Sequence, residues 1–182
     1  MPKYVALFRG INVGGNKIVP MAEMKKVFDK IGLKNVKTLL ASGNAVFESE
    51  IKNSEELTTK ISTALENKFH FPIPVLLRTF SDIKKLIELN PFKGIKVTPH
   101  IRLYATFLSQ RDFQSEKPKH KFTTYVSPDK SFRIISATEN AVFSVLDLSK
   151  AKTPEAMGTL EKEFGKNVTT RNWNTVVKIA KL

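Results

Sequence analysis

The order of sequence patterns in the first ninety residues constrains the fold of this chain most strongly. Apolar runs that predict strands alternate with stretches where apolar residues recur every three or four positions, as on one face of a helix. The predicted strands are Lys3–Phe8, Val36–Ala41, Ala45–Ser49 and Ile73–Thr79. The predicted helices run from Pro20 to Ile31 and from a cap at Asn53 or Ser54 through Leu65. The order strand-helix-strand-strand-helix-strand is that of a ferredoxin-like fold.

The second half of the chain is richer in strands. A short helix from Ser81 or Asp82 ends at Asn90-Pro91, and the Pro- and Gly-containing stretch Asn90–His100 predicts a boundary. Predicted strands follow at Arg102–Ser109, Phe122–Val126, Phe132–Thr138 and Ala141–Leu148, with a polar loop or frayed helix at Gln110–Lys121. One helix is expected to begin with Thr153 as its cap and Pro154 as its first helical residue, and a last helix is expected from about Thr170.

We therefore expect an α+β protein made of two parts. Residues 1–92 would form the ferredoxin-like βαββαβ unit. Residues 101–182 would form a strand-rich antiparallel unit with C-terminal helices, packed against the first.

Composition excludes several classes of site and protein. The chain of 182 residues has no cysteine, which removes disulfides, thiolate zinc sites, iron–sulfur clusters and cysteine nucleophiles. Its 41% hydrophobic and 26% charged residues are typical of a globular protein. The first apolar run, Tyr4–Phe8, stops at Arg9, far short of a signal sequence or a membrane span. A soluble cytoplasmic protein with no membrane partner is expected, and its oligomeric state stays open.

The net charge of +13 would suit a polyanionic partner. The basic residues are evenly spread, however, with ten in each of residues 1–60, 61–120 and 121–182. Only six of the thirty are arginine, the side chain best suited to bidentate contacts with phosphate and guanine. This distribution favours a solvated surface over a nucleic-acid footprint.

A glycine-rich segment, Arg9-Gly-Ile-Asn-Val-Gly-Gly-Asn-Lys17, separates the first predicted strand from the first predicted helix. The backbone N–H groups of such a loop, helped by a helix N-terminus, can cradle an anion. It is not a P-loop, because Asn16 stands where lysine is needed and Lys17 where Ser or Thr is needed. The alternative is a turn in which Asn12 and Asn16 bond local backbone.

Two more segments concentrate polar residues. Ser42-Gly43-Asn44 predicts a hairpin turn, because Gly and Asn accept positive φ angles. Thr169–Thr175 surrounds the only tryptophan, Trp173. A helix cap at Thr170 and a core tryptophan would explain part of this segment. That interpretation gives no reason for the remaining polar residues, Arg171, Asn172 and Asn174.

These three segments resemble those of a known family. The stretches LFRGINVGGNKIVPMAEMKKVF, VKTLLASGNAVFES and TTRNWNTVVKIAKL are similar to signature stretches of the family called domain of unknown function 1697. The resemblance spans the whole chain except about Gln110–Lys130. It implies an α/β architecture built from ferredoxin-like pieces in small bacterial cytoplasmic proteins. It implies no activity and therefore no catalytic residues.

Catalysis and nucleic-acid binding are the weaker function classes. No nucleophile elbow or HExxH motif is present, so catalytic residues stay unassigned and the question of an enzyme stays open. His70, His100 and His120 lack metal-like spacing, so neither a metal nor a cofactor is expected. Leu7–Ile11 faintly resembles the short motif of RNA-recognition domains. The longer motif needs several aromatic residues, and residues 42–47 supply only Phe47.

The leading hypothesis is that the three polar segments converge on one pocket for a small ligand bearing phosphate or carboxylate groups. The expected ligand-binding residues are Arg9, Asn12, Gly14, Gly15, Asn16, Ser42, Asn44, Arg171, Asn172 and Asn174. One alternative is an RNA- or DNA-binding module of ferredoxin-like type. The other is a purely structural role, in which the same side chains are buried and bonded to backbone.

Overall fold

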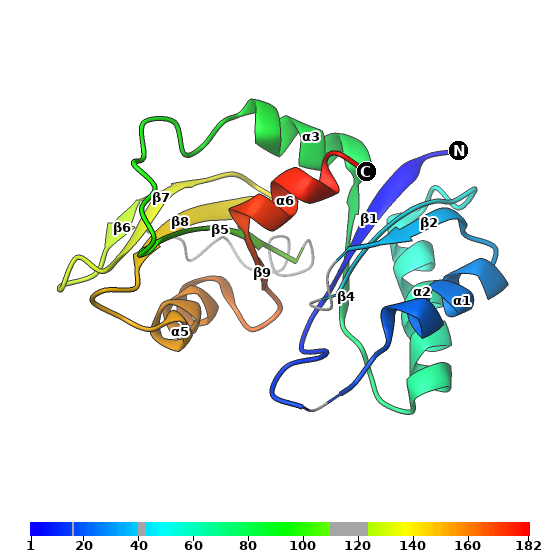
Figure 1. Cartoon of the computed structure of the whole chain (residues 1–182). Coiled ribbons are helices and arrows are strands. Elements are labelled where there is room, and N and C mark those ends of the chain that lie inside the picture. The colour runs from blue at the N-terminus through cyan, green and yellow to red at the C-terminus, as the bar shows by residue number, and fades with distance from the viewer. Residues whose placement is uncertain (16, 40–42, 110–123) are drawn as a thin grey trace. The chain divides into compact units, whose positions relative to one another are not determined.

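The computed structural model of the chain (Figure 1) describes residues 1–15, 17–39, 43–109 and 124–182. By its internal contacts the chain divides into two compact units. Unit 1 contains Met1–Leu86 and Lys178–Leu182, and unit 2 contains Ile87–Val177. In unit 1, the ammonium group of Lys37 donates to the carbonyl oxygen of Leu182 at 3.2 Å.

Unit 1 contains a four-stranded antiparallel sheet with the order β2-β3-β1-β4. Its strands are β1 (Lys3–Phe8), β2 (Lys34–Thr38), β3 (Asn44–Glu48) and β4 (Val75–Thr79). β1 lies between β3 and β4, with Ala6 opposite both Ala45 and Leu77. All four strands overlap the predicted ones, although β2 begins two residues before Val36 and β4 two residues after Ile73.

Two helices, α1 (Met21–Lys30) and α2 (Ser54–Phe69), cover one face of this sheet (Figure 1). Pro20 precedes α1 at the N-cap, and Asn53 caps α2 by accepting the N–H groups of Glu55 and Glu56. The core between helices and sheet includes Phe8, Phe28, Phe47, Leu57, Ile61 and Leu65. On the opposite face Val5, Leu7 and Val46 are buried as well, as the continuous apolar run of β1 predicts.

Unit 2 contains a five-stranded antiparallel sheet with the order β6-β7-β8-β5-β9. Its strands are β5 (Ile101–Phe107), β6 (Tyr125–Val126), β7 (Phe132–Ala137), β8 (Ala141–Asp147) and β9 (Thr169–Asn172). Helix α5 (Thr153–Phe164) packs on the face that carries Tyr104, Val142 and Leu146. Helices α3 (Phe80–Glu88) and α6 (Trp173–Ile179) each contain a point where the chain passes from one unit to the other.

Three predicted boundaries are wrong. The last helix begins at Trp173 and not near Thr170, because residues 169–172 form strand β9 against β5. Helix α3 begins at Phe80, where the hydroxyl of Thr79 caps it by accepting the N–H of Asp82 at 3.1 Å. The N-cap of α5 is Lys152, so Thr153 is the first helical residue and not the cap.

The chain is therefore a mixed α/β protein with two antiparallel sheets. The predicted polar loop Gln110–Lys121 and the start of the strand predicted from Phe122 lie outside the described residues. The division into domains 1–92 and 101–182 stays a prediction. Among the helices that the structure describes, none is both long enough and apolar enough to cross a membrane.

Candidate functional site

The glycine-rich loop follows β1 in unit 1 and has an unusual backbone. Five of its described residues adopt left-handed φ angles, namely Gly10 (67°), Asn12 (56°), Gly14 (60°), Gly15 (77°) and Lys17 (49°). Gly14 and Gly15 are exposed, and a side chain built on either would meet no atom within 4 Å. These glycines are therefore required by the conformation of the loop and not by lack of space. Asn16, predicted as a ligand residue, lies outside the described residues.

Asn12 closes the base of this loop. Its side-chain oxygen accepts the backbone N–H of Val19 at 2.8 Å, and its side-chain amide donates to the Val19 carbonyl at 2.9 Å. Its own backbone N–H donates to the carbonyl of Lys17 at 3.1 Å. The side chain thus imitates a strand partner and holds Asn12 beside Val19, so that these two positions of the segment lie together. This is the local bonding expected of Asn12 if the segment is a turn.

The structure brings the first two predicted segments together. Gly43 accepts the backbone N–H of Phe8 at 3.0 Å, and its φ angle is 84°. An added Cβ atom at Gly43 would lie 2.7 Å from Cδ1 of Ile11, so only glycine permits this approach. Asn44 is fully buried, and its side-chain amide donates to the Leu39 carbonyl at 2.8 Å. Ser42 lies outside the described residues.

Arg9 lies at the point where β1 ends. Its backbone N–H donates to the carbonyl of Pro74 at 3.1 Å, just before β4 begins. The preceding residue, Phe8, is held by Gly43 just before β3 begins. Hydrogen bonds to the residues just before β3 and β4 therefore fix the backbone at the start of the glycine-rich loop, where the half-buried Arg9 lies.

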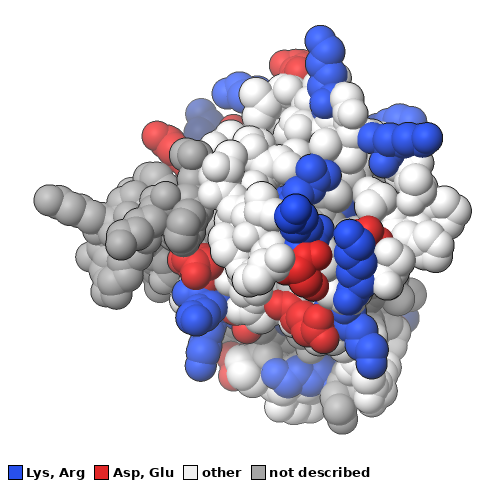
Figure 2. All heavy atoms as spheres, turned by 90° about the vertical axis from the view of Figure 1, so that its left-hand side faces the viewer, with Lys and Arg blue, Asp and Glu red and all other residues white. Residues whose placement is uncertain are grey.

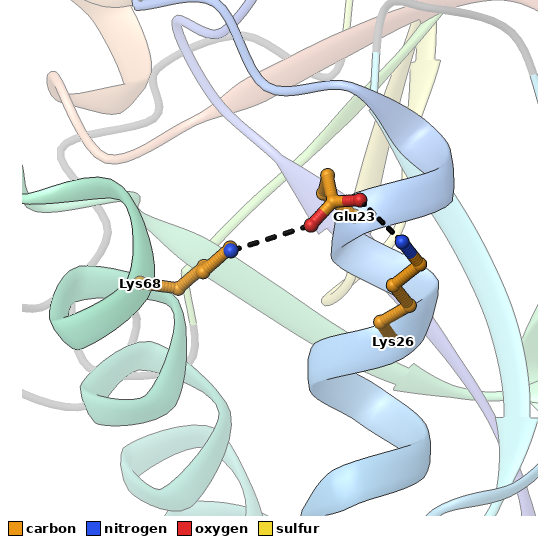
Figure 3. A network of polar contacts seen from close by, with 3 residues as sticks. All are labelled: Glu23, Lys26 and Lys68. Carbon is orange, nitrogen blue, oxygen red and sulfur yellow. Dashed lines mark hydrogen bonds and ion pairs between the residues drawn. The ribbon is translucent and has the colours of Figure 1, made fainter.

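The end of α2 meets the start of α1 beside this loop. Glu23 in the first turn of α1 bonds Lys26 at 2.7 Å and Lys68 of α2 at 3.3 Å, and Figure 3 shows its carboxylate between the two ammonium groups. Its hydrogen bond to Lys26, followed by that to Lys68, lowers the pKa of the Glu23 carboxyl. Because both lysine side chains are exposed and that of Glu23 is 33% exposed, these ion pairs add little stability, but they gather cationic side chains at this end of the unit.

The third predicted segment belongs to unit 2 and is built into its sheet. Thr170 lies opposite Thr106, and their hydroxyl groups are 2.9 Å apart in a hydrogen bond. Asn172 accepts the backbone N–H of Asn174 at the start of α6, so Asn172 and not Thr170 occupies the cap position of the last helix. Asn174 itself is exposed.

Arg171 and Trp173 lie within the packed part of unit 2. Arg171 is 9% exposed and donates to the Thr170 carbonyl at 3.0 Å. Burial lowers the pKa of its guanidinium to about 10. The half-buried ring of Trp173 packs edge-on against Phe92 and Phe143, with ring centroids 5.2 and 5.9 Å apart. The expected core tryptophan is therefore only half-buried, with its ring packed on two buried phenylalanines.

The aromatic residues of the unit 1 sheet do not form an exposed stacking platform. Phe8 and Phe47 are 1% and 0% exposed and pack against α1 and α2. The RNA-recognition interpretation requires such rings on an open face. Figure 2 also shows Lys and Arg side chains scattered over the face in view with Asp and Glu among them, as the sequence predicts for a solvated surface.

No catalytic or metal arrangement emerges from the part of the chain that the structure covers. Within it, no group of three His, Cys, Asp or Glu side chains could hold a metal ion. The clearest shifts in pKa other than Glu23 fall on the buried Arg78 and Arg171, on Asp129 in the β6–β7 turn and on Asp147 at the end of β8. The two carboxyls accept hydrogen bonds from neighbouring serines, so both shifts have a local structural cause.

Comparison with known proteins adds the family. Residues 1–143 match the family described as Protein of unknown function (DUF1697). The chain belongs to this family. The match includes the first two polar segments and ends before Thr169, so the resemblance of the third segment stays a prediction. A search of curated proteins found no match.

The chain is also similar to a solved structure. This is the conserved bacterial protein SP0830 from Streptococcus pneumoniae, which is 25% identical in sequence with a TM-score of 0.69. The similarity covers 99% of this chain and 97% of that one. The fold of this chain is thus similar to that of a conserved bacterial protein over nearly the whole length of both chains.

Sequence patterns missed one neighbour of the loop. The half-buried Phe71, after α2, lies with its ring centroid 6.0 Å from the ammonium nitrogen of Lys17. The sequence signal was available, because Phe69-His70-Phe71-Pro72 places two aromatic residues just before β4. Nothing in the spacing of Lys17 and Phe71 along the chain indicates that they meet.

Proposed function

We propose that unit 1 binds a small ligand bearing phosphate or carboxylate groups at the glycine-rich loop. The observation that carries this proposal is the left-handed, exposed backbone of Gly14 and Gly15, together with the bonds by which the Asn12 side chain holds Val19. Backbone of this kind can direct successive N–H groups toward one point and bind an anion. Because Asn12 already holds the loop closed, little conformational freedom would be lost on binding.

Charge supports the same site. Arg9 enters the loop and Lys17 leaves it, so two cationic side chains flank the glycines along the chain. Lys68 lies in the last turn of α2 and pairs with Glu23 in the first turn of α1, the helix that follows the loop. Cations and backbone N–H groups together give the charge-assisted hydrogen bonds that phosphate and carboxylate groups favour.

The fold of unit 1 supports a finer description too. We infer a ferredoxin-like unit, since the element order β1-α1-β2-β3-α2-β4 and the sheet order β2-β3-β1-β4 both agree with it. In this proposal Asn12 and Asn44 shape the site through backbone bonds, and Arg171 and Asn172 stabilise unit 2. Convergence of all three segments on one ligand, and a cytoplasmic location, stay predictions.

Inorganic phosphate tests the proposal directly. Phosphate should raise the melting temperature of the wild-type protein and give a measurable heat of binding by calorimetry. Gly14→Ala should weaken phosphate binding at least tenfold, because alanine disfavours a φ of 60° and moves the backbone N–H groups.

Gly32→Ala is the matched control. Gly32 also has a positive φ (86°) with nothing within 4 Å of an added Cβ, but it follows α1 at its other end. The two variants should lose similar stability, and only Gly14→Ala should lose phosphate binding. Equal phosphate affinity in both, or no binding by wild type, would contradict the proposal.

A further inference from the structure

Two aromatic rings at the end of α2 differ from the aromatic residues in the core of unit 1. Phe69 and Phe71 are half-buried, whereas Phe8, Phe28 and Phe47 are at most 1% exposed. The ring centroids of Phe69 and Phe71 are 6.4 Å apart with an interplanar angle of 38°. Part of each ring is therefore accessible to solvent, and Phe71 lies near Lys17 of the glycine-rich loop.

The backbone holds Phe71 in this place. Helix α2 ends at Phe69, and His70 adopts a left-handed conformation (φ 63°) while its N–H donates to the Glu66 carbonyl at 2.8 Å. This cap reverses the chain, so Phe71 returns against the core that α2 covers. The ring is thus positioned by a helix cap on one side and by the buried Ile73 on the other.

Lys17 connects the aromatic pair to the loop. Its ammonium nitrogen is 6.0 Å from the centroid of Phe71, at the limit of a cation–π contact. The same residue follows Gly14 and Gly15 in the loop and has a φ of 49°. One ligand could therefore contact loop backbone, a cation and an aromatic face within a single unit.

We propose that the ligand of this loop is a nucleoside phosphate, with its phosphate at Gly14, Gly15 and Lys17 and its base against Phe71. This inference rests on the proposed anion site and names its ligand class. Any of the four bases can stack on an aromatic ring, because every base has a flat π-face. A sugar phosphate or inorganic phosphate would use the loop and leave the ring without a contact.

The experiment compares ligands that carry one or both parts. Binding of the four nucleoside monophosphates, ribose 5-phosphate, inorganic phosphate and adenosine is measured by calorimetry on the wild-type chain. At least one nucleoside monophosphate should bind about tenfold tighter than ribose 5-phosphate, the gain expected from one stacked base. Phe71→Leu should remove this difference and leave the affinity for ribose 5-phosphate and phosphate unchanged.

Phe80→Leu is the matched control. Phe80 is also half-buried beside lysines, with the ammonium nitrogens of Lys3 and Lys84 at 3.9 and 5.3 Å from its centroid. It lies at the other end of β1 from the loop, about 17 Å along the strand. This variant should bind every probe as wild type does.

The outcomes separate the two proposals. If phosphate and ribose 5-phosphate bind but no nucleoside monophosphate binds more tightly, the nucleoside inference is wrong and the anion site stands. If Phe71→Leu weakens all phosphate-bearing probes equally, the ring supports the fold only and the inference is again wrong. If no phosphate-bearing probe binds wild type, the anion site itself is contradicted.

Discussion

The glycine-rich loop of unit 1 and the segment Thr169–Asn174 of unit 2 contain similar polar residues but use them differently. In the loop, Asn12 bonds backbone and leaves the exposed Gly14 and Gly15 in an unusual conformation. In unit 2, Thr170 bonds a partner strand and Arg171 is buried. The first arrangement leaves backbone polar groups near solvent, and the second places polar side chains inside a sheet.

The comparison teaches that burial, and not residue type, separates the two roles. Arginine and asparagine suit anion binding wherever they are accessible. Once Arg171 is buried, its charged form is disfavoured, as its lowered pKa of about 10 shows. A polar segment should therefore be assigned to a ligand only after its exposure is known.

The largest expected effect is on the stability of unit 2. Arg171→Ala should lower the free energy of unfolding by about 2 kcal/mol, because it removes a buried side chain and its charged hydrogen bond to Thr170. Urea unfolding followed by fluorescence measures this in unit 2, since Trp173 is the only tryptophan.

Arg171→Met and Arg9→Ala sharpen the result. Methionine keeps the buried stem without the charge, so Arg171→Met should recover at least half of the lost stability and bind phosphate as wild type does. Arg9→Ala should do the reverse, with weaker phosphate binding and a smaller loss of stability. Loss of phosphate binding in Arg171→Met would remove the distinction between the two segments.

The next effect concerns the closure of the loop. Asn12→Gly keeps the left-handed conformation but removes both side-chain bonds to Val19, so it should cost about 1.5 kcal/mol and weaken phosphate binding. Urea unfolding by circular dichroism and calorimetry with phosphate measure the two changes. Asn35→Gly is the control, because Asn35 is also left-handed (φ 52°) but its side-chain amide donates to the carboxylate of Glu48 at the surface and not to the loop. Equal losses of phosphate binding in both variants would contradict the role of Asn12.

The smallest effect concerns a polar turn that should have no ligand role. In the β6–β7 turn, Asp129 accepts hydrogen bonds from Ser127 and Ser131, which lower the pKa of its carboxyl to about 2. Because this pKa is depressed on folding, its contribution to stability is present above the unfolded pKa and disappears as the pH falls through about 2. Ser127→Ala should raise the pKa of Asp129, as measured by an NMR titration of the carboxyl carbon.

Ser149→Ala is the control for this titration. The Ser149 hydroxyl donates to Asp147 and lowers the pKa of that carboxyl, so its removal should shift Asp147 and leave Asp129 unchanged. Phosphate should not alter the titration of Asp129. A phosphate-dependent shift there would show that polar turns outside the glycine-rich loop also bind anions.

Local patterns predicted most elements because local physics decides them. The apolar run of β1 and the apolar residues repeated every three or four positions in α1 and α2 can each be recognised within a short window of sequence. Strand β9 was missed, because the four residues Thr169–Asn172 form a strand only through pairing with β5. The two β-branched threonines were the available signal, but a cap was an equally local explanation.

The candidate site was predictable only in part, for the same reason. Glycines at positions 14 and 15 indicate left-handed backbone from sequence alone, and the structure confirms it. The approach of Gly43 to Ile11, the burial of Arg171 and the position of Phe71 beside Lys17 all depend on residues distant in the sequence. The spacing of residues along the chain therefore could not predict these contacts.

The most direct test of the account is an NMR titration of backbone amides with inorganic phosphate, against chloride at equal ionic strength. The account predicts saturable shifts in the amides of Gly14, Gly15 and Lys17, while those of Thr169–Asn174 stay unchanged. Saturable shifts in Thr169–Asn174 without any in the loop would contradict it, as would the absence of phosphate-specific shifts anywhere.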